Sequence, residues 1–72
     1  MIQQLHLYKG CVIEKDGNIM TFMWCHKSGK IMDAHSKTHP VAMFLNRDIK
    51  DTLTKLQEAG WKITEEYKKV EL

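Results

Sequence analysis

The dipeptide Asp16-Gly17 is the feature that most restricts how this chain can fold. An Asp-Gly pair between two apolar runs is typical of a two-residue hairpin turn, because both residues tolerate the positive φ angles that such a turn needs. Ser28-Gly29 is a second and weaker signal of the same kind. Together the two turns predict three antiparallel strands, at residues 4–15, 18–27 and 30–36.

A helical pattern follows in the second half of the chain. Ile49, Leu53 and Leu56 are spaced so that they share one face of a helix. Asn46 or Asp48 can cap the start of this helix with a side-chain oxygen. A glycine at position 60 then suits the left-handed residue that commonly ends a helix.

The segments on either side of this helix complete the expected fold. Residues 37–45 contain a proline and predict a connection, with a short extended piece at 41–45, whereas the alternation over residues 61–72 predicts a last strand. We therefore expect one α+β domain over residues 1–72. It consists of a small antiparallel sheet of three to four strands, in the chain order β-β-β-α-β, with the helix packed on one face.

The turns also predict which side chains share a face of the sheet. With Lys15 opposite Asn18 and Lys27 opposite Lys30, directly opposed residues lie on the same side. The heavier face, which we expect the helix to cover, then carries Leu5, Leu7, Cys11, Ile13, Met20, Phe22, Trp24, His26, Ile31, Asp33 and His35. The other face is also apolar, and it carries Tyr8, Val12, Ile19, Met23, Cys25, Met32 and Ala34.

This second apolar face needs a covering element, because one helix covers only one side of a small sheet. The connection at 37–45 could fold beneath it, or its side chains could be half-buried at strand ends. Exposed apolar patches otherwise mark contacts with other molecules. The expected contact surface combines this face with the hairpin and loop at 27–39, and its residues are Tyr8, Val12, Met23, Cys25, Met32, Lys27 and Lys30.

The function that this surface predicts is that of a small non-enzymatic interaction protein. Such an adaptor or inhibitor would bind another protein, or a second copy of itself as a homodimer. A chain of 72 residues without catalytic motifs also suits an accessory protein of a mobile element. No cofactor and no enzymatic activity are expected.

A nucleic-acid-binding module is the alternative that the lysines suggest. Lysines cluster near the second turn and along the last strand, and with Trp24 and Tyr8 exposed they would form a stacking platform for single-stranded nucleic acid. The net charge of +2 is mild, and Arg47 is the one arginine, which disfavours specific base recognition. Lysines on edge strands also serve simply to deter pairing between sheets.

A metal site is the alternative that the cysteines and histidines suggest. His35 and His39 have the spacing of a zinc-binding pair, but Cys11 and Cys25 are too far apart in sequence to form the usual knuckle. On the expected register the two cysteines point to opposite faces, which disfavours both a shared metal and a disulfide between them.

Catalysis has two weak candidate arrangements. Cys25 with His26 or His35 is the candidate nucleophile–base pair, but Cys25 and His26 are neighbours in a strand and point away from each other. Asp33 lies between His26 and His35 on the expected face and could orient an acid–base pair. We weigh both below the interaction hypothesis.

The expected location is the cytoplasm. The sequence has no leader pattern and no apolar run approaching eighteen residues, so we expect no membrane partner and reduced thiols.

Overall fold

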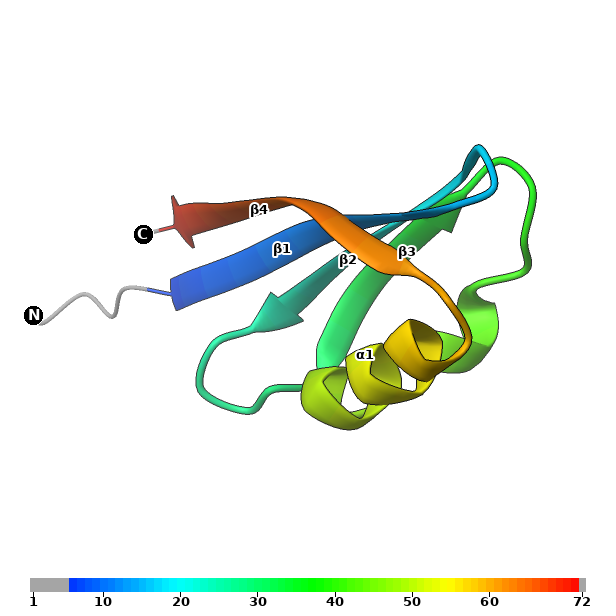
Figure 1. Ribbon diagram of the computed structural model, residues 1–72. Helices are drawn as coiled ribbons and strands as arrows, with labels where there is room; N and C mark the ends of the chain where they lie inside the picture. Colours follow the sequence, from blue (N-terminus) through cyan, green and yellow to red (C-terminus); the bar gives the residue numbers. More distant parts are fainter. Residues whose placement is uncertain (1–5, 72) are drawn as a thin grey trace, which may run out of the picture.

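The protein forms a four-stranded antiparallel sheet with one α-helix lying against one face (Figure 1). The structure is a computed structural model that describes residues 6–71, the last of these by its backbone alone. The elements in chain order are β1 (His6–Lys15), β2 (Asn18–Cys25), β3 (Ile31–Ser36), the 3₁₀ turn η1 (Ala42–Phe44), α1 (Ile49–Glu58) and β4 (Lys62–Glu71). The sheet order is β3-β2-β1-β4. The predicted α+β fold is therefore confirmed, and the last strand joins the sheet.

The first hairpin has the predicted register. Lys15 is the partner of Asn18, and Ile13 is the partner of Met20. Asp16 and Gly17 adopt φ angles of 52° and 83°, which are the positive values that a tight two-residue turn requires. Strand β1 is described from His6, so positions 4 and 5 of the predicted strand lie outside the described residues.

The second hairpin has a longer loop than predicted. The N–H of Cys25 donates to the carbonyl of Lys30 at 3.3 Å, and the N–H of Gly29 donates to the carbonyl of Cys25 at 2.8 Å. Residues 26–29 therefore form the loop, and Lys27 is not opposite Lys30. A further irregularity between Met23 and Trp24 shifts the pairing again along β3.

This shift corrects the predicted faces of β3. Ala34 is the partner of Phe22 and packs against the core, whereas Asp33 is the partner of Met23 on the opposite face. His35, the partner of Thr21, lies on that face too. The expected places of Asp33, His35 and Ala34 are thus exchanged, because a slip of one residue moves every side chain to the other side of a sheet.

The helix begins and ends where its sequence signals predict. The Asp48 side chain accepts a hydrogen bond from the N–H of Asp51 at 3.1 Å, which caps the first turn. Gly60 ends the helix with a φ angle of 103°. The N–H groups of Gly60 and Trp61 donate to the carbonyls of Gln57 and Leu56, both at 3.0 Å, in the pattern of a Schellman motif. This turn directs Trp61 back toward the sheet.

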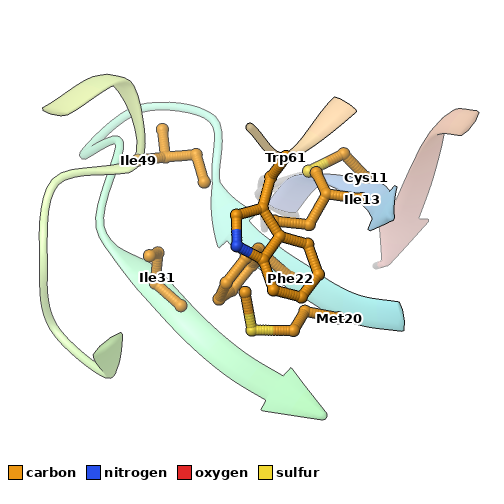
Figure 2. Close-up of a cluster of buried hydrophobic side chains, with 7 residues drawn as sticks. All are labelled: Cys11, Ile13, Met20, Phe22, Ile31, Ile49 and Trp61. Carbon is orange, nitrogen blue, oxygen red and sulfur yellow. The ribbon is translucent and has the colours of Figure 1, made fainter. Parts of the chain in front are cut away.

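The core lies between the helix and the face of the sheet that we expected the helix to cover, and Figure 2 shows its buried side chains. Its buried side chains are Cys11, Ile13, Met20, Phe22, Ile31, Ile49 and Trp61. Leu53 and Leu56 pack against this cluster from the helix. Burying one large apolar side chain stabilises the fold by roughly 1.5–3 kcal/mol, so these few residues account for much of the stability of so small a chain.

The connection between β3 and α1 also packs on the helix side. Val41 and Phe44 contact the core, and the Phe44 ring meets Phe22 edge-to-face with 5.4 Å between ring centroids. Residues 42–44 form a 3₁₀ turn where a short extended piece was expected. The connection therefore does not fold beneath the second apolar face. No helix in the part of the chain that the structure describes is long and apolar enough to cross a membrane.

Candidate protein-contact surface

The sheet face opposite the helix, which we call the open face, is left uncovered by the elements at residues 6–71. The strand registers place on it His6, Tyr8, Gly10, Val12 and Glu14 of β1, Ile19, Thr21, Met23 and Cys25 of β2, Asp33 and His35 of β3, and Lys62, Glu65, Tyr67 and Lys69 of β4. Most of the apolar side chains lie on the two central strands. Charged side chains lie on the two outer strands and at the end of β1, where Glu14 is the partner of Ile19. The open face is thus an apolar strip with a polar border.

The middle of the open face is a single row of side chains across all four strands. Tyr67, Gly10, Met23 and Asp33 are successive partners in this row. Gly10 has no side chain, and the ring of Tyr67 occupies the space above it, where a Cβ atom would overlap the ring. The tyrosine ring therefore extends from the outer strand toward Met23.

Four of the predicted contact residues lie together on this face. Tyr8, Val12, Met23 and Cys25 come from the two central strands, and each is half-buried. Met32 lies at the irregularity in β3 and is 50% exposed.

The two predicted lysines lie at the end of the sheet. Lys27 is exposed in the 26–29 loop, next to Cys25 in the chain. Lys30 forms a backbone bridge with Asp48, and its side chain lines a hollow beside the helix with Asp51. Lys30 thus does not join the open face.

The two cysteines lie in contrasting environments. Cys11 is fully buried, and burial, reinforced by the nearby charge of Glu66, raises the pKa of its thiol to about 11. Cys25 lies on the open face, where hydrogen bonds from the backbone N–H groups of Ser28 and Lys27 lower the pKa of its thiol. The two thiols are not joined in a disulfide. Cys25 is therefore the more readily ionised thiol.

The two histidines that were candidates for a metal site do not converge. His35 is 2.9 Å from Asp33, between Nε2 and Oδ2, on the open face. His39 packs edge-to-face against Trp61 on the helix side, with 5.3 Å between ring centroids. Across residues 6–71, no three His, Cys, Asp or Glu side chains are grouped so that they could hold a metal ion.

His35, but not its partner Asp33, lines a hollow of about 500 Å³ at one end of the open face. This hollow is lined by Gly17, Ile19, Thr21, His35, Ser36, Lys37 and Thr38. The Ser36 hydroxyl donates to the carbonyl of Ile19 at 2.9 Å, so it is held in a structural hydrogen bond beside the pair.

The two aromatic residues of the expected stacking platform lie on opposite faces. Tyr8 is the partner of Cys25 on the open face, and Trp24 is the partner of Lys9 on the helix side. The lysines of β4 also lie on both faces. Lys68 is opposite Lys9 on the helix side, and Lys69 is opposite Tyr8 on the open face. The geometry does not bring Trp24, Tyr8 and the lysines into one platform.

Sequence reasoning missed the contribution of the last strand to the open face. Tyr67 covers the centre of β1, and Glu65 and Lys69 form one border. Gly10, a glycine within a strand, was the signal that a bulky group from a neighbouring strand lies above it. Comparison with known protein families, curated proteins and solved structures finds no match for the chain.

Proposed function

We propose that this protein is a small non-enzymatic interaction protein, an adaptor or inhibitor, that binds another protein through its open face. One observation carries the proposal. The helix and η1 pack on the same side of the sheet, and they leave the apolar side chains of Val12, Met23 and Tyr8 half-buried on the other. Contact with an apolar protein surface would remove these side chains from water, which is favourable in free energy.

The charges around the apolar strip favour a protein over a nucleic acid as the partner. Asp33 and Glu65 lie on opposite outer strands, so carboxylates border the strip on both sides. His35 lies on the β3 border with Asp33, and Lys69 lies on the β4 border with Glu65, so each border carries a basic as well as an acidic residue. Phosphate groups prefer an uninterrupted basic surface, whereas an apolar centre with a mixed polar rim is the usual anatomy of a protein interface.

The proposal is tested by comparing two methionine substitutions. Met23→Lys places a charge in the centre of the open face, and Met43→Lys places the same charge on η1, where Met43 is 57% exposed. Both variants are first compared with the wild type by circular dichroism and thermal unfolding. Tagged wild-type and variant proteins are then expressed in the source cells, captured, and compared by quantitative mass spectrometry.

We expect the wild type and Met43→Lys to retain the same protein in stoichiometric amount, and Met23→Lys to lose it. Light scattering is also used to measure the mass of each purified protein. Loss of binding to another protein leaves this mass unchanged, whereas loss of self-association would lower it. Retention of that protein by a folded Met23→Lys variant would overturn the proposal, as would the absence of any stoichiometric protein from the wild-type sample.

A further inference from the structure

Strand β4 has an exposed outer edge. It pairs with β1 on one side, and no other strand at residues 6–71 lies beside it. Its side chains from 64 to 70 are all exposed. The opposite edge of the sheet differs, because the N–H of Ile31 in β3 donates to the carbonyl of Arg47 at 2.9 Å and its carbonyl accepts from the N–H of Asn46 at 2.8 Å. Part of the β3 edge is thus covered, and the β4 edge is available for another strand.

The charges along β4 are arranged symmetrically about Tyr67 with opposite signs. The sequence from 65 to 69 is Glu-Glu-Tyr-Lys-Lys. If two copies of β4 pair in antiparallel order with Tyr67 opposite Tyr67, then Glu66 faces Lys68 and Glu65 faces Lys69, and each pair occurs twice. Opposite charges directly across two strands stabilise their pairing, and like charges oppose it.

This arrangement selects one register. Sliding the two copies by one residue pair to either side places Glu66 opposite Glu66, or Lys68 opposite Lys68, at the centre of the pairing. A parallel pairing in register would place every charge opposite its own kind. Charged side chains on an edge strand commonly deter association with another sheet. Here, however, the order of the charges is complementary to itself, as a two-fold symmetric interface requires.

The backbone of β4 is suited to this pairing over the same residues. Its irregularity opposite β1 falls between the partners of Val12 and Ile13, so the strand pairs regularly with β1 from Glu65 onward. Tyr67 is held over Gly10 and is 38% exposed. In an antiparallel pair with residue 67 opposite itself, both tyrosine rings stand on the same side of the joined sheet.

We propose that two copies of this chain join along β4, in antiparallel order about a two-fold axis at Tyr67, to form one continuous eight-stranded sheet with both helices on the same side. This contact runs along the edge of β4 and includes Glu65, Tyr67 and Lys69 at the border of the open face, but not Met23 at its centre. Met23→Lys therefore tests the proposed function without changing the contact, so failure of one proposal can be distinguished from failure of the other. It would place the open faces of the two copies side by side as one longer surface.

The test uses two charge-reversed variants, E65K/E66K and K68E/K69E, in sedimentation equilibrium at low salt. We expect the wild type to be a dimer and each variant alone to dissociate, with a dissociation constant raised by more than about tenfold. An equimolar mixture of the two variants should form a heterodimer, because the opposed charges are then complementary again. The variant with all four substitutions, E65K/E66K/K68E/K69E, should form the homodimer again. Its amino-acid composition is the same as that of the wild type.

Two controls accompany this test. K50E/K55E changes the charge of the helix to a similar extent and should leave the dimer intact, and Met23→Lys should also leave it intact because that residue lies at the centre of the open face. Circular dichroism of each variant establishes that it is folded. A wild type that is monomeric up to millimolar concentration would overturn the proposal, as would a dimer whose dissociation constant is the same in E65K/E66K and K68E/K69E as in the wild type.

Discussion

The ring of Tyr67 in β4 lies over the backbone of Gly10 in β1, in the space that a side chain at position 10 would occupy. This contact joins the last strand of the chain to the first across the open face. It also explains why a residue without a side chain is present in the middle of a central strand, where glycine ordinarily weakens a sheet.

A double-mutant cycle between these two residues tests the contact. Alanine in place of glycine in a strand ordinarily stabilises by about 0.5–1 kcal/mol, but Gly10→Ala should destabilise here because the new Cβ displaces the Tyr67 ring. In a Tyr67→Ala background the same substitution should become neutral or stabilising. Urea unfolding of the four proteins gives the coupling free energy. Equal effects of Gly10→Ala in both backgrounds would contradict the contact, and Glu65→Ala serves as a background in which the penalty should persist.

Two isoleucines test the assignment of the faces. Ile13 is fully buried beneath the helix, whereas Ile19 is 51% exposed on the open face. Ile13→Val should lower the free energy of unfolding by about 0.5–1.5 kcal/mol, and Ile19→Val should change it by less than about 0.5 kcal/mol. Chemical unfolding of both variants measures the difference. A larger loss from Ile19→Val than from Ile13→Val would mean that the helix covers the other face.

The stability of the fold should decline in alkali because of Cys11. The folded-state pKa of the Cys11 thiol, about 11, lies above that of an exposed thiol. The contribution of this thiol to the free energy of unfolding is therefore fully present below about pH 8.5 and is lost as the pH rises toward 11. The difference in unfolding free energy between the wild type and Cys11→Ala should therefore be constant at neutral pH and narrow between about pH 9 and 11. A difference that stays constant to pH 11 would contradict the burial of this thiol.

Cys25 should react with thiol reagents before Cys11 does. Hydrogen bonds from the N–H groups of Ser28 and Lys27 stabilise its thiolate, which is the reactive form, and Cys11 is buried and protonated. A chromogenic disulfide reagent at neutral pH should modify one thiol rapidly and the second only on unfolding. In the Cys25→Ala variant the rapid phase should disappear. Two equally rapid phases in the wild type would show that the environments are not distinct.

The first hairpin could be predicted from the sequence because Asp16-Gly17 specifies both the turn and its length. The helix could be predicted for a similar local reason, since Asp48 caps its start and Gly60 ends it. These signals depend on neighbouring residues alone. The pairing of β1 with β2, and with it the positions of Val12 and Met23, followed from the first turn.

The second hairpin could not be predicted because Ser28-Gly29 does not specify the length of its loop. The register of β3 depends on contacts with residues far along the chain. Ile31 is buried in the core, and its backbone is bonded to Asn46 and Arg47. Those contacts place Asp33 on the open face, and no signal in the sequence around β3 predicts them.

The most direct test of the open face as a protein-contact surface is site-specific photo-crosslinking in the source cells. A photoreactive amino acid is introduced at Met23, in the centre of the open face, and, as a control, at the exposed position Thr54 on the helix. We predict that the probe at Met23 crosslinks one defined protein in high yield and that the probe at Thr54 does not. Equal crosslinking from both positions, or a Met23 probe that reacts only with solvent, would contradict the account.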